Sequence, residues 1–250
     1  MTEKIDKYKV QAALVRSFFD AFSHGVIESQ VEDRKEKTTP QSVKKLMLEH
    51  YEHIAPAFFD TMFFPLAAMN YKYEDIAALA REAQQRGDDM MALVRTACGN
   101  EAYYNAMVEE YKRNFSMLLA GKYLSNADHL EGYVRKAEAE TEASVDSDRA
   151  IELTVRVVMF AYVRGLSQTG EGARFDRSAH LRQVHPLRGA TLFRLMLDAM
   201  NILLLDEAVD FADAEAADLA SLFLKVCQTQ HNFTVMTNEM DRTYSELMKE

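Results

Sequence analysis

The stretch NEAYYNAMVEEYKRNFSMLLAGK, residues 100–122, indicates the fold class of this 250-residue chain. Its apolar side chains recur every three or four residues, at Tyr103, Met107, Tyr111, Phe115 and Leu118. The charged residues at 109, 110, 112 and 113 lie largely off this stripe, and Asn100 precedes it as a residue that can cap a helix. The spacing therefore predicts an amphipathic helix with one buried face.

The rest of the chain carries the same period. Behind Thr39 and Pro40, which suit a helix start, apolar residues again fall three and four apart, at Val43, Leu46, Met47, Tyr51 and Ile54. Only 9 glycines and 4 prolines interrupt a sequence that is 48% hydrophobic, which favours long helices over sandwiches, barrels or disorder. No repeat of 20 to 50 residues is seen.

We therefore predict an all-α fold, a multi-helix bundle of about ten helices, arranged as a single compact domain or as two closely packed helical halves. A charged linker near 31–40 divides the chain into an N-terminal helix with its linker, 1–36, and a helical core domain, 37–250. The β-branched run 155–163 is expected to be helical, and a break is expected at Pro65. The expected helices are 4–30, 40–54, 57–69, 73–86, 88–97, 100–122, 126–143, 147–168, 176–184, 187–205 and 213–248.

Charge and cysteine content suggest a compartment. The net charge of −10 disfavours nucleic acid and anionic membranes as partners, and the apolar runs are too short to span a bilayer. Cys98 and Cys227 lie among apolar or small neighbours, as reduced core residues do. We expect a cytoplasmic protein that binds neither membranes nor specific DNA sequences.

One segment is basic in this acidic chain. The candidate binding residues are Arg174, Arg177, His180, Arg182, His185 and Arg188, to which Arg164 and Arg194 add further positive charge. Arginine suits bidentate recognition of carboxylates and phosphates. The main hypothesis is a non-enzymatic binding or regulatory protein for an acidic partner or a phosphate-bearing ligand, with no cofactor. Alternatively, these arginines pair internally with acidic residues of 138–148 or 206–218.

An acidic cluster supports a second hypothesis. Asp206, Glu207, Asp210 and Asp213 resemble the aspartate-rich motif of isoprenoid synthases, which are all-helical enzymes. The resemblance implies that these carboxylates hold magnesium against a diphosphate substrate, with the arginines as its clamp. A second acidic motif on a facing helix, which that family requires, is not evident in this sequence.

The stretch 185–190, His-Pro-Leu-Arg-Gly-Ala, resembles the phosphoacceptor site of histidine phosphotransfer domains. The resemblance implies a phosphorylated histidine in the middle of an exposed helix. Pro186 departs from that pattern, because a proline favours the first position of a helix and would leave His185 at a cap or in a turn.

Two further segments bear on metal binding and assembly. Glu49, His50 and His53 have metal-ligand spacing on a helix, but His50 continues an apolar stripe and is expected to be a core residue without metal. The apolar patch Phe58–Phe64 is dense enough to support a homodimer, although burial between helices would also account for it.

Overall fold

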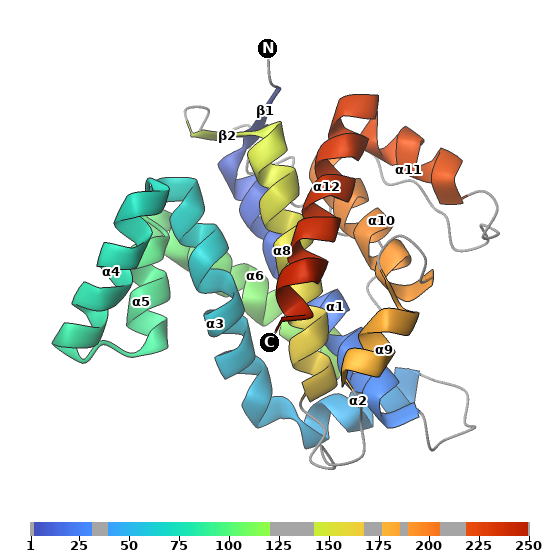
Figure 1. The fold of residues 1–250 in the computed structure, drawn as a ribbon. Coiled ribbons are helices and arrows are strands. Elements are labelled where there is room, and N and C mark those ends of the chain that lie inside the picture. Colours follow the sequence, from blue (N-terminus) through green and yellow to red (C-terminus); the bar gives the residue numbers. More distant parts are fainter. Residues whose placement is uncertain are drawn as a thin grey trace.

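The computed structural model describes residues 3–31, 40–120, 143–167, 177–185, 190–205 and 219–249, which form eleven helices and one two-stranded sheet (Figure 1). The first half of the chain contains β1 (Lys4–Asp6), α1 (Lys7–Val31), α2 (Pro40–Glu49), α3 (Tyr51–Asn70), α4 (Tyr73–Arg86), α5 (Met90–Ala97) and α6 (Glu101–Leu119). The second half contains β2 (Ser144–Asp146), α8 (Ser147–Ser167), α9 (Arg177–Gln183), α10 (Ala190–Leu204), α11 (Leu219–Cys227) and α12 (Gln230–Leu247). The predicted all-α, multi-helix fold is confirmed.

Most helix boundaries follow the sequence pattern. Asn100 caps α6, because its side chain accepts a hydrogen bond from the backbone N–H of Tyr103. The β-branched run 155–163 lies inside α8, as expected. Residues 4–6 form a strand instead of the first helical turn, since they pair with residues 144–146 at the other half of the chain.

Three expected features of the helices were wrong in detail. The helices expected over 40–54 and 57–69 are divided at His50, because α2 ends at Glu49 and α3 begins at Tyr51. The predicted break at Pro65 is absent, and α3 runs through both Pro56 and Pro65 because Pro65 is buried in the packed core. The predicted helix 213–248 includes two helices, α11 and α12. Gln228 lies between them in the left-handed region, at φ 62°, and the Thr229 side chain then caps α12.

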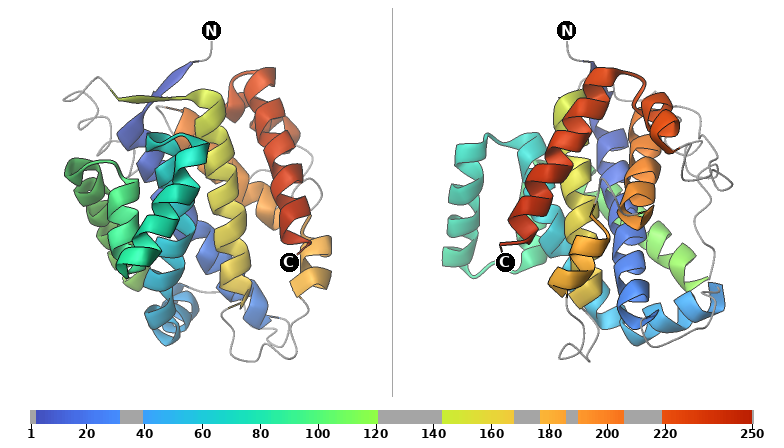
Figure 2. Two further views of the ribbon diagram at one scale, coloured as in Figure 1. Left: turned by 60° about the vertical axis from the view of Figure 1, so that its left-hand side comes forward. Right: turned by 45° about the vertical axis from the view of Figure 1, so that its right-hand side comes forward.

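The central pair of helices is α1 and α8, with the other helices around them (Figure 2). Their leading strands pair antiparallel, with Ile5 opposite Val145. Further along, the helices touch at two glycines. A Cβ at Gly25 would lie 2.1 Å from the carbonyl oxygen of Tyr162, and a Cβ at Gly165 would lie 2.2 Å from that of Phe22. Only glycine permits so close an approach of two backbones.

These contacts are reciprocal, because the second half of the chain repeats the first. Ile5 and Val145, Phe22 and Tyr162, and Gly25 and Gly165 are all separated by the same 140 positions. Helix α3 of the first half packs on α8, while α10 of the second half packs on α1. The two halves therefore face each other about a local two-fold axis that runs between α1 and α8.

The repeat extends to the last helices of each half. Cys98 and Cys227 end α5 and α11, each is followed by a residue with positive φ, and a capping residue then starts α6 or α12. Both cysteines are buried and free, as the sequence predicts. The N-terminal segment 1–36 supplies α1, so it contributes to the centre of the core.

The aromatic patch at Phe58–Phe64 is divided between core and surface. Phe58 and Met62 are fully buried, whereas Phe59, Phe63 and Phe64 are partly buried against the core. Within the described ranges, no helix combines the length and the hydropathy needed to cross a membrane.

Candidate functional site

Three polar side chains meet at the end of the α1–α8 pair that lies away from the sheet. The Tyr162 hydroxyl donates to Glu28 Oε2 at 2.6 Å, and His180 Nε2 lies 3.0 Å from the same oxygen. His180 Nε2 is also 2.9 Å from the Tyr162 oxygen. Because the tyrosine proton points to Glu28, Nε2 of His180 must carry the proton that it shares between the two oxygens. We call Glu28, Tyr162 and His180 the polar cluster.

The fold brings these residues together from three helices. Glu28 follows Gly25 on α1, and Tyr162 precedes Gly165 on α8, so the close glycine contact places both side chains at one end of the helix pair. His180 comes from α9, where the next residue, Leu181, is buried against the core. The cluster and this leucine together attach α9 to the body of the protein.

The electrostatics favour a charged carboxylate and a neutral phenol. Burial alone would raise the pKa of Glu28, but hydrogen bonds from His180, Tyr162 and Thr191, with the charge of His180, hold that pKa below its usual value. Burial, together with the charge and the hydrogen bond of Glu28, raises the pKa of Tyr162. Glu28 therefore acts as an ionised acceptor for three donors, which suits an anchoring role.

Helix α9 also carries the candidate arginines that the structure describes. Arg182 is exposed and Arg177 is half-buried, and in the described ranges neither side chain forms an ion pair. His185 lies just beyond α9, and its ring packs edge-on against Tyr244 of α12 with centroids 4.4 Å apart. Arg174 and Arg188 fall outside the described residues. The structure thus brings His180 into the cluster and leaves Arg182 open to solvent.

The structure describes one of the two alternative motifs, the start of the stretch 185–190, but not the acidic cluster. Asp206, Glu207 and Asp210 lie outside the described residues, so the magnesium hypothesis stays a prediction. Among the residues that the structure does describe, no group of three or more His, Cys, Asp or Glu side chains could hold a metal ion. His185 lies after the end of a helix, which is not the mid-helix position that the phosphotransfer resemblance implies.

His50 separates α2 from α3 and is half-buried, so it is less enclosed than expected of a core residue. Burial, and then the neighbouring charge of His53, lower the pKa of His50. The two imidazole centroids are 6.3 Å apart. The lowered pKa favours the neutral form of His50 near pH 7.

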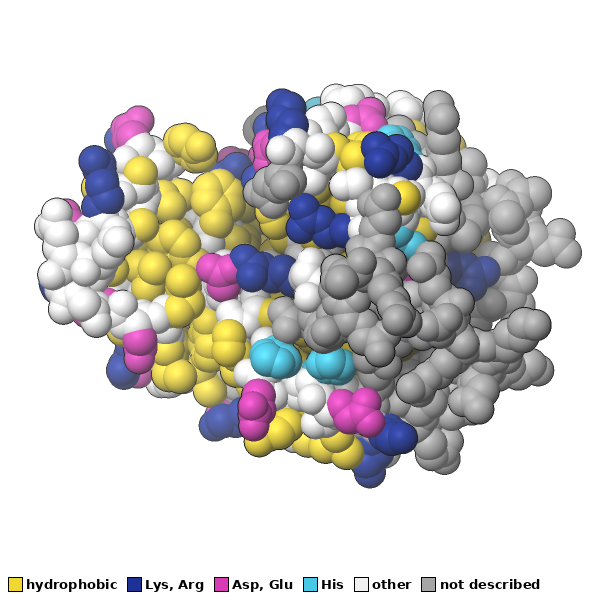
Figure 3. Space-filling model, turned by 60° about the horizontal axis from the view of Figure 1, so that its bottom comes forward, with side chains coloured by type: hydrophobic (Ala, Val, Ile, Leu, Met, Phe, Trp, Pro, Cys, Tyr) yellow, Lys and Arg dark blue, Asp and Glu magenta, His cyan; other side chains and the backbone are white. Residues whose placement is uncertain are grey.

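Apolar side chains are exposed at the end of the molecule that carries the polar cluster, on the side away from α9 (Figure 3). Hydrophobic side chains gather in a hollow next to the lobe formed by α4 and α5 (Figure 3). Phe59 and Phe63 of α3 are partly buried, and the Asp60 carboxylate pairs with Arg164 of α8. Self-association through this patch stays a prediction.

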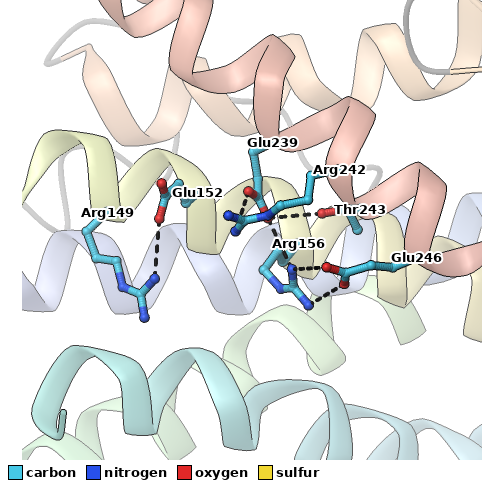
Figure 4. A network of polar contacts seen from close by, with 7 residues as sticks. All are labelled: Arg149, Glu152, Arg156, Glu239, Arg242, Thr243 and Glu246. Atoms are coloured by element: carbon cyan, nitrogen blue, oxygen red, sulfur yellow. Dashed lines mark hydrogen bonds and ion pairs between the residues drawn. The ribbon is translucent and has the colours of Figure 1, made fainter. Parts of the chain in front are cut away.

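A second polar network joins α8 to α12 (Figure 4). Arg156 donates to Glu246 at 2.8 Å and to Glu239 at 3.2 Å, and Arg242 pairs with the same buried Glu239 at 2.5 Å. The Arg156 guanidinium also lies 5.5 Å from the ring centroid of Phe64. The two arginines and the two glutamates of this network pair with one another. The network therefore joins the two helices and is not a candidate ligand site.

The sequence identified His180 but missed its two partners. Glu28 is 152 positions away from His180 and Tyr162 lies in an apolar run, so neither residue stands out by spacing or composition. The one available clue is the repeat, because Tyr162 replaces the Phe22 of the first half. Comparison of the chain with protein-family models, curated proteins and solved structures gave no match.

Proposed function

We propose that the protein is a non-enzymatic binding protein, and that α9 recognises the oxyanions of an acidic partner or ligand. The observation that supports this proposal is the anchoring of α9 by the polar cluster. Because His180 and Leu181 are held against the body, Arg177 and Arg182 extend from a fixed helix instead of a mobile segment. Side chains on a fixed support lose less conformational entropy when they bind.

Charge distribution supports the same surface. The whole chain has a net charge of −10, whereas α9, with the sequence RSAHLRQ, has two arginines, one histidine and no acidic residue. The net charge of the whole chain repels an approaching anion, whereas the local charge of α9 attracts it. The planar guanidinium group adds a geometric preference for carboxylate and phosphate oxygens.

Titration calorimetry on the full chain tests the proposal with two probes, pyrophosphate and an oligoglutamate peptide. Binding of either probe should weaken as salt is added, and the stronger probe identifies the source of the oxyanion. Arg177→Lys with Arg182→Lys keeps the charge but removes the planar forks, so affinity should fall by about tenfold.

Arg81→Lys on the exposed part of α4 is the matched control, since it makes the same chemical change in a distant lobe (Figure 1). It should bind like the wild type. If neither probe binds, or if the α9 double variant also binds like the wild type, α9 is not a recognition surface.

A further inference from the structure

Helix α4 has little of its own chain to pack against. All of its 14 residues are described, and of these Ile76 and Ala83 alone are buried. Figure 1 and the right-hand view of Figure 2 place α4 at the outer edge of the molecule, in the lobe that it forms with α5. A helix shorter than about 12 to 15 residues is only marginally stable by itself in water, and tertiary packing supplies most of the stability of helices in proteins. A further contact is therefore expected to stabilise α4.

Apolar surface is exposed on this lobe and beside it. Tyr73 of α4 is 76% exposed and Met91 of α5 is 50% exposed. Hydrophobic side chains line the hollow next to the lobe (Figure 3), and Phe63 of the neighbouring α3 is only partly buried. Apolar patches that are rimmed by polar residues commonly mark sites of protein–protein contact.

The second half of the chain shows the same helix face covered. Phe63 and Leu197 each lie seven residues before the end of their helices, α3 and α10. The preceding residues, Met62 and Met196, are both fully buried, which supports this match. Leu197 is also fully buried, whereas Phe63 is not. The repeat thus covers in one half a position that stays partly open in the other.

The charges of α4 favour a second copy of the chain as the molecule that covers this surface. The segment 72–86 contains three acidic and three basic residues, so it has no net charge in a chain of net charge −10. Its acidic residues Glu74 and Asp75 lie in the first turn of α4, and Arg86 lies in the last turn. Two α4 helices that lie antiparallel therefore place the acidic end of each beside the basic end of the other.

We propose that the protein forms a homodimer in which the two α4 helices pack antiparallel, each in the hollow next to the lobe of the other copy. A two-fold axis between the α4 helices makes the contact self-complementary, so that assembly stops at two copies. The dimer covers the accessible part of Phe63 and gives α4 the packing that one copy lacks.

Sedimentation velocity on the full chain tests this proposal. The protein should have the mass of two chains at high concentration and of one chain on dilution. Amide hydrogen exchange, followed by mass spectrometry over the same concentrations, should slow several-fold in α4 as the dimer forms. Exchange in α11, which lies in the other half of the chain (Figure 1), should not depend on concentration.

A charge in the hollow should oppose association. Phe63→Glu would bury a carboxylate without a partner in the dimer, so the dissociation constant should rise at least about tenfold. Leu224→Glu makes the same kind of change at an apolar residue of α11 that is 44% exposed, and it should associate like the wild type.

Exchanging the charges of α4 tests the antiparallel arrangement. Glu74→Arg places like charges at the two ends of the contact and should weaken the dimer, whereas Arg86→Glu added to it should restore association. A double variant that associates no better than Glu74→Arg would contradict this arrangement.

Circular dichroism must show that the variants fold. If Phe63→Glu does not fold, the concentration dependence of wild-type exchange in α4 decides the question. A chain that stays monomeric at every concentration would overturn the proposal. So would a dimer in which exchange in α4 is independent of concentration, or a folded Phe63→Glu variant that associates like the wild type.

Discussion

Replacing either of the central glycines by alanine should destabilise the protein strongly. The Cβ of Gly25→Ala would lie 2.1 Å from the carbonyl oxygen of Tyr162 and 2.9 Å from the backbone nitrogen of Leu166. Carbon and oxygen atoms normally approach no closer than about 3.3 Å. Backbone atoms in two long helices cannot rotate away, so α1 and α8 must separate locally by about 1 Å.

The size of the effect follows from two opposing contributions. Alanine in a helix interior is worth about 0.5 to 1 kcal/mol more than glycine when nothing touches it. Overpacking a core costs about 1 to 3 kcal/mol, and a gap of 0.5 to 1 Å forfeits a quarter to a half of each dispersion contact around it. Because the clash is with the backbone of a long helix, the overpacking cost should lie at the upper end of its range, so after the gain in helix propensity we expect each variant to lose about 2 kcal/mol of unfolding free energy, measured by urea denaturation with far-ultraviolet circular dichroism.

Gly87→Ala is the matched control for glycine replacement itself. Gly87 ends α4 with φ 75°, and a Cβ there would meet nothing within 4 Å. It should cost only about 1 kcal/mol, from the left-handed backbone alone. Because Gly25 and Gly165 share one contact, their double variant should lose less than the sum of the single variants. If Gly25→Ala or Gly165→Ala is as stable as the wild type, the two helices do not touch as described.

The polar cluster yields two further predictions. Tyr162→Phe gives this position the side chain of Phe22 and removes the donor at 2.6 Å from Glu28, so it should lose about 1 to 3 kcal/mol in the same urea assay and speed amide hydrogen exchange in α9. A wild-type exchange rate in α9 would contradict the anchoring role. Glu28 has a lower pKa in the folded state than in the unfolded chain, so its contribution to stability is complete above the ordinary carboxyl pKa of about 4.3 and is lost as pH falls through the folded-state value. Glu28→Gln should therefore flatten the loss of stability in acid, and an unchanged slope between about pH 5 and pH 2 would count against it.

Local spacing was sufficient to predict most of the helices. A stripe such as Tyr103, Met107 and Tyr111 depends only on which face of one segment is buried, so it can be recognised in the segment itself. The positions at which a helix breaks or continues were harder to predict, because they depend on how the helix packs against its neighbours. The proline at 65 is tolerated where a buried helix is held from several sides, and Gln228 takes a left-handed conformation that its residue type rarely adopts.

Contacts between distant segments could not be predicted from the spacing of apolar residues along the sequence. The basic surroundings of His180 predict it as a binding residue, yet its role depends on Glu28, and nothing in the local sequence links the two. The internal repeat was missed for a related reason. Its two copies are separated by well over 100 residues and share few identical residues, so the repeat is recognised from contacts in the fold, such as the reciprocal contacts of Gly25 and Gly165.

The repeat also separates residues that serve the fold from residues that need another explanation. A residue type kept at matching positions, such as Cys98 and Cys227 or Met107 and Met236, meets the same packing requirement twice. A residue that differs between otherwise matching surroundings cannot be explained by that shared requirement. Tyr162 is such a position and anchors the helix that the proposed function uses, so Tyr162→Phe, which restores the residue of the other half, is expected to weaken the attachment of α9 while retaining the fold.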